Sequence, residues 1–269
     1  MPKDLAARVA IVSLNTRGIR LAGTSLAERY AAIGAVLDAG DADVACFQEV
    51  LTWWNARLLY RSMRSFKQVS LRPSPLGPAG GLVTFSRLPL SGTTYRGFGV
   101  APEAPGVPKM ARRWARLKGA LMTRLANPRL CVINTHPVAN WDGDWSRENR
   151  FYPLHQAHLA DLARVVRGVD GPAVACGDFN IDRGSSLFGE FIAGTGLADA
   201  FNGSCPPTFR AEYLPPGKAP HCIDFILTAH GVRAEAATVI FVEKEPLPSG
   251  PGYVSDHVGL RASLVLERL

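Results

Sequence analysis

The sequence lacks any apolar run long enough to cross a membrane or to form the core of a secretion signal. The apolar run nearest the start covers residues 9–14, and charges of both signs precede it. We therefore expect a cytoplasmic protein. No feature indicates an obligate protein partner, and we expect a monomer.

Cysteine is scarce, and its spacing fits no zinc site. Three of the five cysteines, Cys46, Cys131 and Cys176, lie in apolar runs, where a thiol behaves as a small hydrophobic group. Cys205 and Cys222 lie in loop-like sequence and could pair if oxidised. We expect reduced thiols, as is usual for a cytosolic protein.

Acidic residues are outnumbered: 23 Asp and Glu face 30 Lys and Arg, which gives a formal charge of +7. This excess favours phosphate-bearing or other anionic partners, although the base composition of a genome is an alternative explanation. A hydrophobic content of 47% excludes disorder and supplies a large core. We expect one domain over residues 1–269.

The hydrophobic pattern predicts strands and helices in alternation. Ser25 and Glu28 form a capping box, and Gly40 ends the helix that they begin. Strands are expected at residues 9–14, 43–47, 81–86, 119–125, 130–135, 172–176, 222–228, 237–242 and 258–266. Helices are expected at 25–40, 53–64, 148–167 and 185–193, and surface segments rich in Pro and Gly at 73–81 and 99–108. More than seven strands indicate an α/β or α+β fold with two packed sheets and helices outside.

Four carboxylates lie directly beside apolar runs, where an unpaired charge would be costly: Glu49, Asp178, Asp224 and Asp256. A divalent cation with oxygen ligands would compensate some of them, and a His or amide partner would compensate others. Taken singly, each could instead cap a helix or turn. Because the polar motifs follow strand ends, we expect several of them to meet in one cleft.

The polar motifs form an ordered set that resembles the endonuclease/exonuclease/phosphatase superfamily. The set is Asn15, Gln48-Glu49, Asn134-Thr135-His136, Gly177-Asp178-Phe179-Asn180, Ile223-Asp224-Phe225-Ile226 and Ser255-Asp256-His257. That superfamily includes DNase I-like nucleases, abasic-site endonucleases, neutral sphingomyelinases and inositol polyphosphate phosphatases. The resemblance spans residues 9–266 and implies a four-layered α/β sandwich, with two packed mixed sheets flanked by helices and a site at one edge.

The resemblance also implies a phosphoesterase that uses Mg²⁺, with Mn²⁺ as a substitute. Glu49 would bind the metal through its carboxylate, and Asn15 would support the same ion or a phosphate oxygen. Asp256 would contribute to the metal or to its water shell. A metal held there would neutralise phosphate charge and stabilise the leaving oxygen.

The catalytic roles that the resemblance implies fall on five residues. Asp178 would orient the attacking water, and Asn180 would donate to a nonbridging phosphate oxygen. His257 would contact the phosphate or relay a proton, with Asp224 holding its ring, and His136 would donate to the phosphate. The formal base is either Asp178 or His257. For His155 and His158 we expect surface or helix-packing roles.

Two features bear on the substrate. Residues 109–129 contain seven basic side chains and no acidic one, so Arg113 and its neighbours could follow a nucleic acid backbone or meet an anionic membrane, or could form a solvated face. Trp141 and Trp145 follow His136 and could enter a lipid interface, stack on bases or pack back onto the body.

The branch of the superfamily is indicated by the segments 207–213, 221–226 and 255–262, which look closest to the sphingomyelinase-like branch. The segment 13–18 has no acidic residue two positions after Asn15, which favours a single-metal site and argues against abasic-site activity. We therefore predict a sphingomyelinase-like phospholipid phosphodiesterase, with peripheral membrane contact. The alternatives are a metal-dependent nuclease acting on DNA or RNA and a noncatalytic binding protein that retains the fold.

Overall fold

The computed structural model describes residues 6–19, 25–99, 104–229 and 231–267. Its strands form two six-stranded sheets. The first has the order β11 (Val232–Ile240), β12 (Gly259–Leu266), β1 (Ala7–Asn15), β2 (Val44–Gln48), β4 (Val83–Ser86), β3 (Gln68–Ser70). The second has the order β5 (Leu90–Gly97), β6 (Gly119–Leu125), β7 (Leu130–Thr135), β8 (Ala173–Asp178), β10 (Asp224–Thr228), β9 (Ala198–Asp199).

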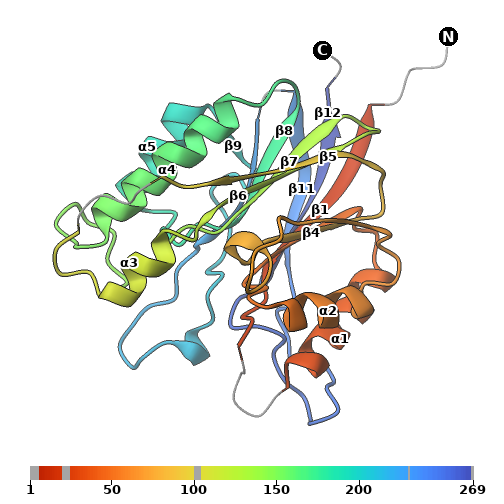
Figure 1. Ribbon diagram of the computed structural model, residues 1–269, viewed down its shortest axis with the longest axis horizontal. Coiled ribbons are helices and arrows are strands. Elements are labelled where there is room, and N and C mark those ends of the chain that lie inside the picture. Colours follow the sequence, from red (N-terminus) through yellow and green to blue (C-terminus); the bar gives the residue numbers. More distant parts are fainter. Residues whose placement is uncertain (1–5, 20–24, 100–103, 230, 268–269) are drawn as a thin grey trace.

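Helices cover the outer faces of both sheets (Figure 1). The first sheet carries α1 (Leu26–Ala39) and α2 (Trp53–Ser62), and the second carries α4 (Tyr152–Arg167) and α5 (Ser186–Thr195). A short helix, α3 (Lys109–Ala115), precedes β6. The 3₁₀ segments η1 (Ala79–Gly81) and η2 (Ala211–Tyr213) lie in loops.

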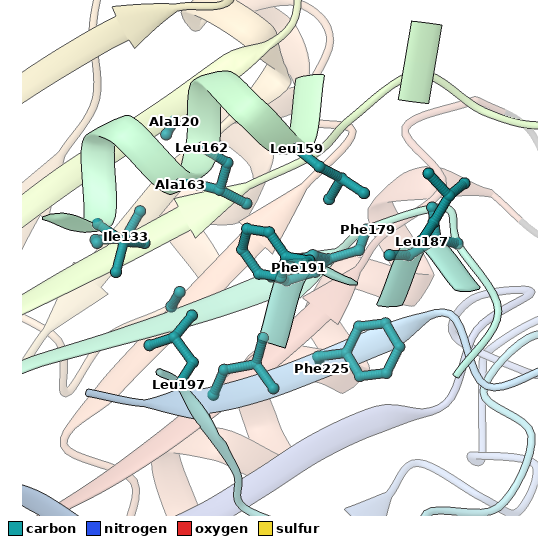
Figure 2. Packing of buried hydrophobic residues seen from close by; sticks show 14 of the residues in the cluster. Ala120, Ile133, Leu159, Leu162, Ala163, Phe179, Leu187, Phe191, Leu197 and Phe225 are labelled. Atoms are coloured by element: carbon teal, nitrogen blue, oxygen red, sulfur yellow. The ribbon is translucent and has the colours of Figure 1, made fainter. Parts of the chain in front are cut away.

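Three apolar layers hold the sandwich together. Side chains of β1 and β2, such as Ile11 and Cys46, meet Val132 and Ile226 of the other sheet between the two. A second layer lies under α1 and α2, and a third lies under α4 and α5, where Figure 2 shows Phe179, Phe191 and Phe225 packed together. The predicted four-layered α/β sandwich is confirmed.

The topology places four strand ends at one edge. β1 runs parallel to β2, and β7 runs parallel to β8, so their carboxyl ends point the same way within each sheet. The antiparallel neighbours β10 and β12 begin where β8 and β1 end, because Asp224 pairs with Asp178 and Leu260 pairs with Ser13. The segments that carry the predicted site residues therefore enter or leave the sheets together.

Several element boundaries differ from the prediction. The helix expected at 148–167 begins at Tyr152, because the preceding loop is held by Arg150, which binds Asp142 through two nitrogens. The strand expected at 237–242 is Val232–Ile240, and the positive φ of Phe241 marks its end. The short elements β3, β5, α3 and β9 were not predicted. Residues 100–103 of the expected surface segment lie outside the described residues.

Two further expectations concern thiols and membranes. Cys205 and Cys222 are free thiols that lie in contact, with Cys222 buried and Cys205 half-buried. In the part of the chain that the structure describes, no helix combines the length and the apolar character that crossing a bilayer requires.

Candidate active site

The strand ends bring together eight predicted residues. Asn15 ends β1, Glu49 follows β2, and His136 follows β7. Asp178 ends β8, with Asn180 two residues later. Asp224 begins β10, and the pair Asp256 and His257 precedes β12. All but Glu49 are buried, so their polar groups must find partners in one another or in a ligand.

Two glycines allow the loops at this edge to touch. A Cβ atom at Gly18 would lie 1.8 Å from the carbonyl oxygen of Glu49. A Cβ at Gly177 would lie 2.0 Å from the carbonyl oxygen of Thr135, and Gly177 has a φ of +142°. Any larger side chain would therefore push the segment of Asp178 away from that of His136.

Backbone strain concentrates at the same edge. Arg17, Glu49 and Asn180 have φ values of 44°, 60° and 54°, in the left-handed region that ordinary residues avoid. Each residue lies one or two positions beyond the end of a strand. Such strain costs of order 1 kcal/mol per residue and clusters at functional sites. The conformations aim the Glu49 and Asn180 segments at a shared cavity.

Asp178 lies at the centre of the polar network. Its Oδ2 accepts a hydrogen bond from Asn15 Nδ2 at 2.8 Å and lies 3.4 Å from His136 Nε2. Its Oδ1 accepts from the backbone N–H of Asn180 at 2.9 Å. Burial alone would raise the pKa of Asp178, but the hydrogen bond from His136, the charges of His257 and His136 and the bond from Asn15 outweigh it and lower the pKa. Asp178 is thus held as an anion.

His257 lies between two carboxylates. Its Nδ1 is 2.8 Å from Asp224 Oδ2, and its Nε2 is 3.8 Å from Asp178 Oδ2. Burial lowers the pKa of His257, but the charges of Asp224 and Asp178 dominate and raise it to about 10. Asp224 fixes the ring so that Nε2 points toward Asp178, and Phe209 packs edge-on against the ring at 5.0 Å.

The predicted metal ligands form the other half of the site. Glu49 Oε1 lies 3.4 Å from Asn15 Nδ2 and 4.0 Å from His136 Nε2, both of which also contact Asp178. Asp256 lines the same cavity, where Arg17 Nη1 donates to its Oδ2 at 2.6 Å. No sequence motif identifies Arg17, because only the folded loop brings it to Asp256.

A second group of potential metal ligands is distinct from Glu49, Asn15 and Asp256. Atoms of Asp178, Asp224 and His257 lie within 4.8 Å of one another and could in principle hold an ion. Hydrogen bonds already join His257 to Asp224, and Asp178 to Asn15. Glu49 has no such ties beyond the long contact to Asn15, so its carboxylate is the one most available to a hard cation.

Lys118 is a site residue that the sequence did not single out. It belongs to the basic segment 109–129, for which a solvated face was one alternative, but the side chain is buried and Nζ lies 2.9 Å from His136 Nδ1. Burial lowers the pKa of Lys118 to about 8, although Glu49 and Asp178 act in the opposite direction. The register of the predicted hairpin could have located it, because Ala120 pairs with Thr135 and Lys118 must therefore approach His136.

The cavity in front of these residues measures about 280 Å³. One wall is made by the loop after β7 and the other by the segment before β10, and Lys218 Nζ joins them by donating to the carbonyl oxygen of Asp142 at 2.9 Å. Trp145 packs back, donating from Nε1 to the carbonyl oxygen of Asn180 and meeting His221 edge-on. Trp141 lines the cavity but is 55% exposed.

Arg113 does not lie in this cavity. It projects from the exposed side of α3, outside the residues that line the hollow. A role of Arg113 in binding the substrate would therefore be played outside the cavity, and it stays a prediction. His155 and His158 are buried in α4, and the Nδ1 of His158 accepts from the backbone N–H of Val138 at 3.2 Å, which steadies the segment after His136.

Known structures share this fold. Beta toxin 275-280 from Staphylococcus aureus is 16% identical with a TM-score of 0.73, and the match covers 94% of this chain and 99% of the other. Sphingomyelinase C from Streptomyces griseocarneus is 18% identical with a TM-score of 0.72, over 96% and 99%. D. rerio TDP2 complexed with single strand DNA product is 17% identical with a TM-score of 0.69, also over 96% and 99%.

A further structure of the toxin contains bound magnesium ions: the F277A, P278A mutant of Staphylococcus aureus beta toxin, at 15% identity and a TM-score of 0.73, over 97% of this chain and 100% of the other. At these identities the likeness concerns the fold alone. No curated protein sequence gives a significant match. The Endonuclease/Exonuclease/phosphatase family matches residues 12–257, which include every polar motif of the site. The chain belongs to the Endonuclease/Exonuclease/phosphatase family.

Proposed function

We propose that the protein is a metal-dependent phosphodiesterase in which water attacks the phosphorus atom in line with the leaving oxygen. The observation that carries the proposal is the meeting of Glu49, Asp178, Asn180 and His257 around one cavity. A noncatalytic scaffold would gain nothing from gathering these charged and polar groups, because each one that is buried costs free energy unless it is compensated.

The residues at the Glu49 side fit Mg²⁺. Glu49 and Asp256 offer carboxylate oxygens to the cavity, and the amide of Asn15 lies beside Glu49, with Nδ2 at 3.4 Å from its Oε1. Carboxylate and amide oxygens are the donors that hard divalent cations prefer. Mg²⁺ bound there would neutralise charge on the phosphate and on the leaving oxygen. Glu49 is the chief ligand in this proposal, because its carboxylate faces the cavity with the fewest partners of its own.

The chain's own side chains divide the remaining work. Asp178 Oδ2 and His257 Nε2 are 3.8 Å apart, so one water molecule can contact both. The Asp178 anion can take its proton, whereas the raised pKa of His257 keeps that ring protonated and suits it to donate to the phosphate. Asn180 faces the cavity and donates to a nonbridging phosphate oxygen. His136, beside Asp178, donates to the phosphate as negative charge develops, and Lys118 behind it supplies further positive charge.

We infer a phospholipid substrate of the sphingomyelin type. The cavity extends from the charged centre along an apolar wall that includes Trp141, Phe209 and Leu214, which suits a substrate with both a phosphodiester and apolar parts. The sphingomyelinase of Streptomyces griseocarneus shares the fold at a TM-score of 0.72. The competing substrate is a nucleic acid, since D. rerio TDP2, which shares the fold at a TM-score of 0.69, is complexed with single strand DNA product.

A substrate panel tests this proposal. The protein is incubated with sphingomyelin vesicles, plasmid DNA and inositol phosphates in Mg²⁺, with EDTA as the control. We expect release of phosphocholine that EDTA abolishes, and no nicking of the plasmid. Metal-dependent nicking without lipid turnover would replace the lipid substrate by a nucleic acid, and turnover of nothing in the panel would contradict the enzymatic proposal.

Variants show whether any turnover belongs to this site. Glu49→Gln keeps the size of the side chain but removes the charge, and should weaken Mg²⁺ binding in a calorimetric titration. Asp41→Asn is the matched control, because Asp41 is an exposed carboxylate that pairs with Arg261 and precedes β2 at the opposite end from the site. Equal Mg²⁺ affinity in Glu49→Gln and the wild type would exclude Glu49 as a ligand.

A further inference from the structure

The helix α3 presents an unusual surface beside the site. Met110, Trp114 and Leu117 lie three to four positions apart and are exposed by 62%, 43% and 62%. Lys109, Arg113 and Arg116 are exposed between and beside them. Single exposed apolar side chains are ordinary, but three of them among cations, two on α3 and one in the turn that follows it, form a patch suited to a binding partner. We call these six residues the α3 face.

The charge of the α3 face is uncompensated along its own segment. From residue 104 to residue 141 the sequence has no Asp or Glu, so no acidic side chain of this segment neutralises the face. A concentration of positive charge around apolar side chains complements a surface that is anionic outside and apolar inside.

The α3 face and the active site are connected through adjacent residues and shared packing contacts. Leu117 is exposed, yet the next residue, Lys118, is buried with Nζ at 2.9 Å from His136 Nδ1. The buried side of α3 packs through Ala111 and Ala115 into a cluster that contains Phe151. Trp141, on the rim of the cavity, packs on the same Phe151 with ring centres 6.3 Å apart. The patch and the cavity rim therefore share one support, and Figure 1 shows α3 beside the start of β6.

We propose that the α3 face docks the protein on an anionic lipid bilayer, with Met110, Trp114 and Leu117 entering the interface and the Lys and Arg side chains meeting lipid phosphates. The proposal extends the proposed function, since it names the surface through which the cavity reaches a lipid substrate. Trp141 would then lie close to the bilayer at the cavity mouth.

A lipid surface fits better than a nucleic acid. Stacking on bases needs aromatic rings, and the α3 face has only one, Trp114. Met110 and Leu117 have no π face and would stay in water on a nucleic acid backbone. Both would leave water at a bilayer, where burying apolar surface is favourable.

The test is vesicle sedimentation in EDTA, so that binding is measured without catalysis. Vesicles of phosphatidylcholine alone are compared with vesicles that contain about one quarter phosphatidylserine, in which each basic residue contributes about fivefold in affinity. We expect the wild type to prefer the anionic vesicles. Arg113→Glu/Arg116→Glu should weaken that binding at least about 30-fold, the square of the single-residue factor.

Two controls separate the contributions. Arg124→Glu/Arg129→Glu makes the same change of charge at exposed positions on the opposite end of the β6–β7 pair, and should bind like the wild type. Met110→Ser/Leu117→Ser should weaken vesicle binding even at high salt, where charge is screened, because this variant loses the apolar side chains that insert into the bilayer. Circular dichroism checks that each variant is folded.

The outcomes are decisive for docking whether or not the site hydrolyses lipid. Equal binding by Arg113→Glu/Arg116→Glu and by the matched control would overturn the proposal, as would a wild type that binds no anionic vesicle. Tighter binding to duplex or single-stranded DNA than to vesicles, lost in the same α3 variants, would assign the face to nucleic acid and also overturn it. A protein that docks on vesicles but cleaves no phospholipid would leave the docking surface standing and contradict the proposed substrate alone.

Discussion

Arg29 offers a quantitative test of how the site loops are held. It is fully buried in α1, and its guanidinium donates to four backbone carbonyl oxygens. These are Thr16 and Val254 at 2.9 Å, Arg17 at 2.9 Å and Ile19 at 2.6 Å. One side chain thus ties the loop after β1 to the segment before β12, the two segments that carry Arg17 and Asp256.

Replacing Arg29 by Met keeps much of the volume and removes all four donors. A hydrogen bond from a charged group contributes about 1.5–3 kcal/mol, and a buried acceptor left alone costs about 1–3 kcal/mol. Burial lowers the pKa of Arg29, because the guanidinium loses its hydration, and this desolvation cost offsets part of the stabilisation by the hydrogen bonds. We expect a net loss of about 3–5 kcal/mol in the free energy of unfolding, or about 10 °C in Tm.

Urea unfolding followed by circular dichroism measures the loss. The control is Arg233→Met, because Arg233 is largely exposed and its ion pair with Glu235 is long, at 3.6 Å. That change should cost less than about 0.5 kcal/mol. A loss below about 1 kcal/mol for Arg29→Met would contradict this role of Arg29, because it would mean that the four carbonyl groups find other partners at no cost.

Two further predictions follow from the site electrostatics. Asp224→Asn removes the carboxylate charge 2.8 Å from His257 Nδ1, so an NMR titration should show a lower pKa for His257. Turnover should fall at least about tenfold with little change in KM, and an unchanged pKa of His257 would contradict the pairing. The pKa of Lys118 is lowered to about 8, so the unfolded chain binds this proton more tightly than the folded protein does. The free energy of unfolding of the wild type, relative to that of Lys118→Met, should therefore rise between about pH 8 and pH 10.5, by about 3 kcal/mol at most. If the difference between the two proteins stays constant across this range, Lys118 is solvated.

The sequence predicts the long strands and helices well because each has a strong local signal. Ser25 caps α1 by accepting from the N–H of Glu28, and Ser185 caps α5 by accepting from the N–H of Phe188, as the capping patterns indicate. The weak elements β3 and β9 have two or three residues and depend on partner strands. The helix α3 has seven residues and is stabilised by packing against Phe151 and Leu154, which local sequence does not reveal.

The site residues also fall into two groups, those with a local sequence signal and those whose contacts depend on the fold. Glu49, Asp178 and His257 stand at strand ends in recognisable motifs, so the sequence could name them. Arg17 and Lys118 could not be named from motifs, because their contacts with Asp256 and His136 depend on loop geometry and on hairpin register. Basic residues near the site look alike in sequence, whereas the fold buries Lys118 and exposes Arg113.

In the proposed reaction Glu49, Asp178 and His257 act on one phosphate in one cavity, and single-site variants show whether they do. Turnover of a phosphodiester in Mg²⁺ is measured for the wild type, Asp178→Ala and His257→Ala, with circular dichroism to verify folding. A positioned general base contributes about 10² to 10⁴ in rate, so each variant should lose at least about 10². Near-normal turnover in either folded variant would contradict the account.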